Sequence, residues 1–131
     1  MSKVGLLLIS HSYHLVTGLR ELLQQVQPDV SIAISGGTDG GIGTNAFDIK
    51  EAIESIYTEE GIVILFDLGS ALINAELALE LLDKNQSKIR LADAPLVEGG
   101  FAAVVEAGIG GSLQEVIEAA EGAKQLQKIT R

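Results

Sequence analysis

Residues 4–12 read Val-Gly-Leu-Leu-Leu-Ile-Ser-His-Ser, and this stretch decides the fold class. Its apolar run lacks the polar alternation of a strand with one solvated face, so it predicts a strand buried on both faces. A helical pattern of leucines follows at residues 15–26. A doubly buried strand that leads into a helix is the start of a βαβ unit, which requires a parallel sheet.

Three further apolar runs, at residues 30–34, 62–66 and 89–92, continue the alternation of strand and helix. Between and after them, apolar residues recur at spacings of three and four, which places them on one helix face. These helices are expected at residues 49–56, 72–82, 101–107 and 113–126. The sequence therefore predicts one domain, residues 1–131, with an open, doubly wound α/β fold. Its mainly parallel sheet of about four strands carries helices on both faces.

Two helix starts have the spacing of a capping box, in which one side chain caps the helix and a second reaches back to it. The pairs are Asp48 with Glu51 and Ser112 with Glu115. The last helix is expected to run from Ser112 to about Gln127, which leaves only residues 128–131 after it.

The composition excludes several classes of protein. Nine basic and 18 acidic residues give a net charge of −9, which repels nucleic-acid phosphates and anionic lipid. The chain has no cysteine, which excludes disulfides, thiolate catalysis and cysteine-bound metals. No apolar run reaches the ~18 residues of a transmembrane helix, and the first residues lack the features of a signal peptide. We therefore expect a cytoplasmic protein with no nucleic-acid or membrane partner.

The carboxyl ends of the predicted strands place four loops at one edge of the sheet, where open α/β sheets bind ligands. His11 lies in the first of these loops and Asp67 in the third. The first and third strands are neighbours in many parallel sheets, so the Asp67 carboxylate could hold one ring N–H of His11. That contact would leave the other ring nitrogen as a neutral nucleophile. Alternatively, the histidine merely closes its strand.

Two other chemistries are open to the same residues. Serines near His11 and Asp67 could form a Ser-His-Asp set for acyl transfer, but no G-x-S-x-G elbow occurs, so helix capping or donation to a phosphoryl group explains them better. These serines are Ser10, Ser12 and Ser70. His14 could join His11 and Asp67 in a metal site of two histidines and one carboxylate. Because His11 precedes the helix proper, we expect no metal and interpret His14 as a surface or interface residue.

Residues 36–44 form a glycine-rich loop after the second strand. The loop matches neither G-x-G-x-x-G nor G-x-x-x-x-G-K-[ST], and it lacks the lysine of a nucleoside triphosphate site. Its glycines permit close backbone approach by a ligand or by another protein. The residues expected to take part in partner docking are Gly36, Gly37, Thr38 and Asp39.

Four motifs together resemble the mannose-family IIA domains of the sugar phosphotransferase system. They are residues 4–12, residues 36–44 with Gly-Gly-Thr-Asp and Ile-Gly-Thr, residues 67–76 with Asp-Leu-Gly-Ser-Ala, Asn74 and Glu76, and residues 94–99 with Ala-Pro-Leu-Val-Glu-Gly. The resemblance is closer still to the phosphoryl-carrier subunits of phosphotransferase-dependent dihydroxyacetone kinases. Transporter IIA domains tend to have Gly-Gly-Ser-Pro after the equivalent aspartate, whereas this chain has Leu-Gly-Ser-Ala at residues 68–71.

This resemblance implies a phosphotransferase subunit that relays a phosphoryl group. The carrier protein HPr would phosphorylate His11, and phospho-His11 would pass the group to ADP held on the subunit DhaL. DhaK, in the same pathway, would present dihydroxyacetone to the resulting ATP. The chain itself would bind no cofactor and no metal, because ADP, ATP and Mg²⁺ are expected on the partner subunit.

The resemblance also implies roles for single residues. Asp67 would orient His11, and Ser12, Gly69 and Ser70 would stabilise the phosphoryl oxygens. Two other functions are open: a IIA component of a mannose-type transporter, which would pass the group to a IIB protein, and a non-catalytic regulatory domain with a flavodoxin-like fold.

Finally, the family implies a homodimer. Because so few residues follow the last expected helix, we expect the subunits to pack through helices and loops without exchanging a C-terminal strand. The apolar residues expected at this interface are Pro95, Leu96, Val97 and Phe101.

Overall fold

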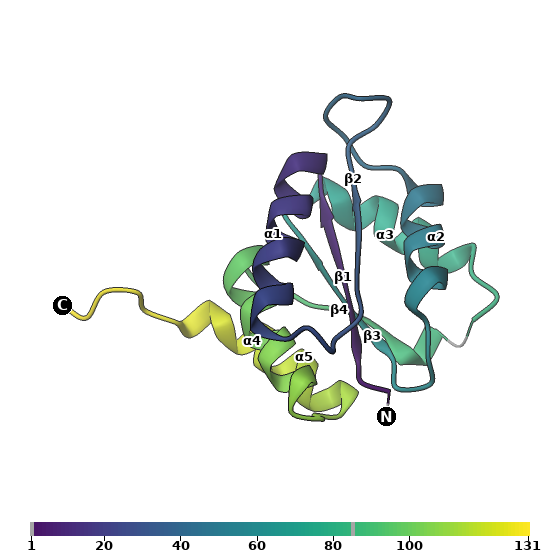
Figure 1. Cartoon of the computed structure of the whole chain (residues 1–131). Helices are drawn as coiled ribbons and strands as arrows, with labels where there is room; N and C mark the ends of the chain where they lie inside the picture. Colours follow the sequence, from purple (N-terminus) through teal and green to yellow (C-terminus); the bar gives the residue numbers. More distant parts are fainter. Residues whose placement is uncertain (1, 85) are drawn as a thin grey trace.

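One parallel sheet, with the strand order β2-β1-β3-β4, forms the centre of the molecule (Figure 1). The computed structural model describes residues 2–84 and 86–131. Within them the strands are β1 (Gly5–Ser10), β2 (Ile32–Gly36), β3 (Ile62–Phe66) and β4 (Ile89–Leu91). Each strand coincides with one predicted apolar run to within two residues. The predicted α/β fold with a parallel sheet is confirmed.

Helices cover both faces of the sheet, as unbroken apolar strands require. They are α1 (Tyr13–Val26), α2 (Ala46–Ile56), α3 (Ser70–Glu80), α4 (Leu96–Gly108) and α5 (Leu113–Gly122), with short 3₁₀ turns η1 (Gln86–Lys88) and η2 (Ala123–Gln125). Leu6 and Leu8 of β1 pack with α1, α4 and α5, whereas Leu7 and Ile9 face α2 and α3. The sheet is thus the middle of three layers (Figure 1). In the described part of the chain, no helix is long and apolar enough to cross a membrane.

The order of the strands creates a switch point between β1 and β3. The chain leaves β1 for β2 on one side and later enters β3 on the other side of β1. Ligands of open α/β sheets bind beyond the carboxyl ends of the strands at such a point. The register pairs Ile9 with Phe66, so the residues that follow these strands, His11 and Asp67 among them, lie at the switch point.

Two predicted features of helix ends are wrong. Asn45, and not Asp48, caps α2, because the Asn45 side chain accepts hydrogen bonds from the N–H groups of Phe47 and Asp48. The last helix does not reach Gln127, because α5 ends at Gly122 and continues only as η2. The capping box predicted at the start of α5 is confirmed.

The sequence predicts that α4 starts at residue 101, and this prediction is also wrong. The helix begins at Leu96, and its two consecutive glycines, which normally indicate a turn, serve close packing instead. A Cβ at Gly99 would lie 2.9 Å from side-chain atoms of Leu65 and Ala94, so a larger residue would push the helix off the sheet. Leu96 is buried in this contact. The sequence predicts that Leu96 belongs to an exposed apolar patch, and this prediction is wrong.

We predict that Gly99→Ala lowers the free energy of unfolding by about 1–3 kcal/mol, because the added methyl group overpacks the contact between α4 and β3. The matched control is Gly18, which is exposed in α1 and has nothing within 4 Å of an added Cβ. Gly18→Ala should raise the free energy of unfolding by about 0.5–1 kcal/mol, because alanine loses less backbone entropy in a helix. Urea unfolding measures both, and an unchanged midpoint for Gly99→Ala would contradict the packing argument.

Candidate functional site

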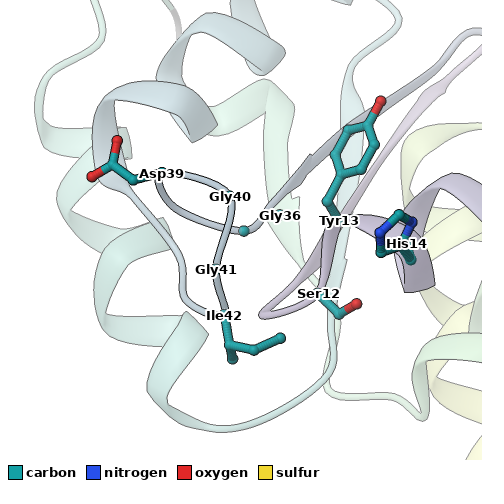
Figure 2. A pocket seen from close by; sticks show the side chains of 9 residues that line it. Ser12, Tyr13, His14, Gly36, Asp39, Gly40, Gly41 and Ile42 are labelled. Carbon is teal, nitrogen blue, oxygen red and sulfur yellow. The ribbon is translucent and has the colours of Figure 1, made fainter.

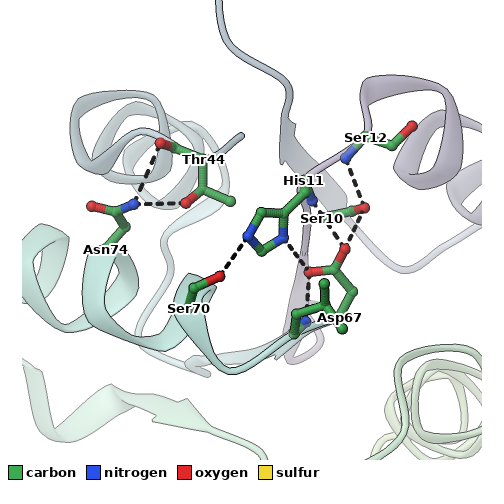
Figure 3. A network of polar contacts seen from close by, with 8 residues as sticks. Ser10, His11, Ser12, Thr44, Asp67, Ser70 and Asn74 are labelled. Carbon is green, nitrogen blue, oxygen red and sulfur yellow. Dashed lines mark hydrogen bonds and ion pairs between the residues drawn. The ribbon is translucent and has the colours of Figure 1, made fainter. Parts of the chain in front are cut away.

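The site forms because β1 and β3 pair in parallel and end together. β1 ends at Ser10 and β3 at Phe66. The Asp67 amide extends the ladder, donating to the carbonyl of Ile9 at 3.1 Å. The side chains that follow the two strands therefore meet at one edge of the sheet (Figure 3).

Two partners hold the imidazole ring of His11. Nδ1 lies 2.9 Å from Asp67 Oδ1, and Nε2 lies 2.7 Å from Ser70 Oγ (Figure 3). An ionised carboxylate can only accept, so Nδ1 carries the proton and donates it. In the neutral ring Nε2 is then the acceptor, and the Ser70 hydroxyl donates to it. The ring is fixed by both contacts and is about one-fifth exposed (20%), which are the properties of a positioned nucleophile.

Asp67 is itself held by several donors. Oδ2 accepts from the Ser10 hydroxyl at 2.8 Å and from the His11 backbone N–H at 3.0 Å, and Oδ1 also accepts from the Leu68 backbone N–H at 2.7 Å. Burial acts to raise the pKa of Asp67, but the hydrogen bonds, of which that from the His11 amide is the largest, together outweigh it and lower the pKa below its ordinary value. The carboxylate is therefore ionised and fixed in one orientation at neutral pH.

Ser10 completes this network from the interior. It is fully buried, and its hydroxyl donates to Asp67 while it accepts the backbone N–H of Ser12 at 3.0 Å. From the sequence, Ser10 is only one of three candidate partners for the histidine. A serine directly after a buried strand and directly before the histidine is the signal that could have assigned it to Asp67.

Gly69 and Ser70 lie at the N-terminus of α3, next to Nε2 of His11. Gly69 is the N-cap residue, with no side chain to occupy the helix end. A helix N-terminus attracts anions through its dipole, and here the amides of Ala71 and Leu72 already donate to the carbonyls of Leu68 and Gly69. A phosphoryl group on Nε2 would lie next to this helix end and the Ser70 hydroxyl.

Ser12 lies elsewhere. Its hydroxyl accepts from the backbone N–H of Leu15 at 3.3 Å and so caps α1. In Figure 3 this hydroxyl lies on the side of His11 away from Ser70. Ser12 thus caps α1, and its hydroxyl does not lie next to Nε2. The role predicted for it from the sequence, stabilisation of the phosphoryl oxygens, would require that position.

Residues 36–44 fold back on themselves beside the start of α1 (Figure 2). Thr38 and Gly41 exchange backbone hydrogen bonds of 3.1 and 2.7 Å, and Asp39 at the tip has a left-handed φ of 48°. Between this loop and α1 lies a pocket of about 440 Å³. Its lining residues are Ser12, Tyr13, His14, Gly36, Gly37, Asp39, Gly40, Gly41 and Ile42. Of the four expected docking residues, Thr38 alone is not in the lining, and the pocket adjoins His11 without including it.

His14 belongs to this pocket and not to the histidine site. Its ring centroid lies 6.0 Å from that of Tyr13, in an edge-to-face arrangement. Among residues 2–84 and 86–131, no three His, Asp or Glu side chains gather closely enough to hold a metal ion. The alternative metal site of His11, His14 and Asp67 is therefore not assembled in the described part of the chain.

A second set of contacts ties the glycine-rich loop to α3 and to His11. The Asn74 side chain donates to Thr44 Oγ1 at 2.6 Å and to the Thr44 carbonyl at 3.3 Å. The Gly43 backbone N–H donates to the His11 carbonyl at 2.8 Å. Neither Thr44 nor Asn74 is among the residues for which the sequence predicts a role. The signal available was that Asn74 follows Ser70 by four residues, a spacing that puts both on one helix face.

Comparison with known proteins identifies the family. Residues 5–117 match the EIIA-man family model, described as "PTS system fructose IIA component". A relative from Providencia stuartii, named "PEP-dependent dihydroxyacetone kinase, phosphoryl donor subunit DhaM", is 41% identical over 131 residues, which cover 95% of this chain and 28% of the relative. A relative from Listeria innocua, the phosphoryl donor subunit DhaM of "PEP-dependent dihydroxyacetone kinase 2", is 42% identical over 118 residues, which cover 88% of this chain and 94% of the relative. The chain thus spans less than a third of the longer relative.

Solved structures agree with this assignment. A crystal structure of a protein of unknown function matches with a TM-score of 0.81 and 34% identity, over 93% of this chain and 95% of that chain. A mannose/sorbose-specific IIA subunit from Enterococcus faecalis matches with a TM-score of 0.59, over 98% of this chain and 96% of that chain. At 18% identity, that second match shows the shared fold alone. Because the family model covers most of the chain and the Listeria relative is matched over nearly its full length, the chain belongs to the EIIA-man family and, within it, to the DhaM subunits.

Proposed function

We propose that this chain is a phosphohistidine carrier that accepts a phosphoryl group from phospho-HPr on His11 and passes it to ADP bound on DhaL. DhaK acts in the same pathway, so that the relay drives phosphorylation of dihydroxyacetone in the cytoplasm. The observation that carries the proposal is the fixed His11 ring, with Nδ1 donating to Asp67 and Nε2 facing the helix N-terminus of α3. The names of the relatives, which are phosphoryl donor subunits, support the choice of pathway.

Uptake forms one bond and breaks one. The lone pair of Nε2 attacks the phosphorus of the donor phosphohistidine, and the donor P–N bond breaks with its electron pair returning to the donor nitrogen. The proton on Nδ1 stays hydrogen-bonded to Asp67, whose negative charge stabilises the positive charge that develops on the His11 ring. The Ser70 hydroxyl and the positive end of the α3 dipole stabilise the phosphoryl oxygens.

Delivery reverses these steps. A terminal phosphate oxygen of ADP attacks the phosphorus, the P–N bond to His11 breaks, and its electron pair returns to Nε2. The product is ATP on the partner subunit, which also supplies the nucleotide contacts and Mg²⁺. The acidic surface of this chain, with a net charge of −9, suits a basic docking face on HPr.

Ser70, His11 and Asp67 also have the contacts of a Ser-His-Asp hydrolase. The backbone argues against that function, because the nucleophile elbow of an α/β-hydrolase is a strained turn. Gly69 has an ordinary helical φ of −56°, and among the described non-glycine residues only Asp39 has a positive φ. Ser70 is therefore better explained as a donor than as a nucleophile.

We predict that phospho-HPr labels His11 and not His14. His11→Ala should abolish incorporation of ³²P from phosphoenolpyruvate, enzyme I and HPr, whereas His14→Ala should retain it, because only His11 has an oriented ring nitrogen at the switch point. Ser70→Ala should still be labelled, although more slowly, which a serine nucleophile would not allow. Full labelling of both histidine variants would refute the assignment.

The acceptor is tested with the labelled protein. Transfer of ³²P to DhaL loaded with ADP, yielding labelled ATP, supports the proposed pathway. Transfer to a mannose-type IIB protein instead would make the chain a transporter component. If His11 takes up no label, the carrier function is wrong and the alternative of a non-catalytic regulatory domain remains.

A second prediction concerns Asp67. Asp67→Asn can present an amide N–H to Nδ1 where an acceptor is needed, so uptake should slow by about 10³–10⁴-fold, as loss of an orienting carboxylate does elsewhere. The variant should still fold, as judged by circular dichroism. Because the pKa of Asp67 is lowered in the folded state, the ionised Asp67 carboxylate stabilises the fold at any pH above its ordinary pKa. This stabilisation is lost as the pH falls through the lowered pKa. An unchanged uptake rate would eliminate the orienting role.

We also propose a homodimer that packs through α1 and α4. Leu22, Val97 and Phe101 are each about half exposed, and together with Leu126 they line an apolar groove of about 290 Å³. Apolar patches of this kind mark contact surfaces.

We predict that the chain sediments as a dimer at tens of micromolar and that Phe101→Asp shifts it to monomer, because the substitution replaces a large apolar contact with a carboxylate that loses its hydration in the interface. Ile73→Asp, on exposed α3, is the control and should leave the dimer intact. A monomeric wild-type protein would disprove the dimer, and dissociation by Ile73→Asp alone would disprove the choice of surface.

A further inference from the structure

Thr44 lies next to the histidine site although it is distant from His11 in sequence. Ser70 and Asn74 are four residues apart on α3 and therefore share one face of the helix. Ser70 contacts Nε2 of His11, and Asn74 contacts Thr44. Thr44 is thus held about one helical turn from the contact between His11 and Ser70 (Figure 3).

The loop that carries Thr44 is also anchored on the opposite side. The N–H of Gly43 donates to the carbonyl of His11 at 2.8 Å, and the carbonyl of Gly43 accepts from Gly37 N–H at 2.9 Å. Residues 43 and 44 are therefore tied to the backbone of His11 on one side and to α3 on the other. In Figure 3, Thr44 and Ser70 lie on the same side of the imidazole, the side that Nε2 faces.

The hydrogen bonds of Asn74 determine where the Thr44 hydroxyl hydrogen can point. A carbonyl oxygen can only accept, so the Asn74 atom that contacts both the carbonyl and Oγ1 of Thr44 is the amide nitrogen. Oγ1 therefore accepts from Asn74, and its own hydrogen must point elsewhere. Within residues 2–84 and 86–131, no hydrogen bond donated by the Thr44 hydroxyl is present, so this donor is available to a ligand.

We propose that the Thr44 hydroxyl donates to a phosphoryl oxygen when His11 is phosphorylated, and that Asn74 positions it by occupying the other side of Oγ1. The inference rests on the proposed carrier function. Once phosphorus is bonded to Nε2, Ser70 can no longer donate to that nitrogen and turns to a phosphoryl oxygen. Ser70 and Thr44 then donate to the group, and the positive end of the α3 dipole adds to the stabilisation of its charge in both directions of transfer.

The test compares Thr44→Val, which keeps the branched shape without the hydroxyl, with Thr44→Ser, which keeps the hydroxyl. Phosphoryl uptake from phospho-HPr and from phosphoramidate, a small donor that needs no docking face, should fall by about 10²-fold in Thr44→Val with both donors. Thr44→Ser should stay within a few-fold of wild type. The ³¹P resonance of phospho-His11 should shift in Thr44→Val and remain in Thr44→Ser, a readout that a purely structural role of Thr44 would not move.

Asn74→Leu tests the positioning role. If Asn74 acts through Thr44, then Asn74→Leu slows uptake in the wild-type background but has no further effect when combined with Thr44→Val. Equal uptake by wild type and Thr44→Val, or additive losses in the double variant, would overturn the proposal while the carrier function stands. Failure of wild-type protein to carry phosphate on His11 would overturn both.

Discussion

The hydrogen bond between Nδ1 of His11 and Asp67 is the interaction on which the rest of the site depends, and the register of β1 against β3 makes it possible. Side chains alternate along a strand, so a slip of one residue would turn the wrong side chains toward the edge. The buried apolar residues on both faces of β1 prevent such a slip, because it would exchange the two halves of the core. The geometry of the site is therefore specified by buried leucines and isoleucines that lie outside it.

The proposed carrier function sets up an electrostatic conflict in an acidic protein. The net charge of −9 opposes a dianionic group, but exposed charges separated by more than about 8–10 Å are largely screened at physiological salt. The donors around Nε2 act at hydrogen-bond distance. Among residues 2–84 and 86–131, Asp67 is the one carboxylate in direct contact with the His11 ring, and its oxygens are already satisfied by Ser10 and by backbone amides. The local donors thus outweigh the distant charges, while the acidic surface remains available for partner selection.

Much of the fold and the pair of His11 with Asp67 could be predicted from the sequence, because both follow from patterns that are local. Doubly buried strands appear as unbroken apolar runs, and a parallel sheet places the residues after each run at one edge. The failures share a different cause. The start of α4 could not be predicted because Gly99 is required by its contact with Leu65, on a strand distant in the sequence. The cap of α2 could not be predicted because Asn45 is one of several polar residues near the start of that helix. The contact between Thr44 and Asn74 joins segments whose approach only the folded chain reveals.

The anchoring of the glycine-rich loop also bears on how such carriers diversify. Gly43 is bonded to His11, and Thr38 to Gly41, through main-chain atoms alone. These bonds use no side chain of the tip, residues 39–42, which lines the neighbouring pocket together with the start of α1. Positive φ angles restrict the residue type at Asp39 and Gly40. The other two positions, Gly41 and Ile42, can therefore change charge and shape during evolution without moving the histidine. Partner choice and phosphoryl chemistry are separable traits in this architecture, so a duplicated copy of the chain can acquire a new partner while its reacting atoms remain in place.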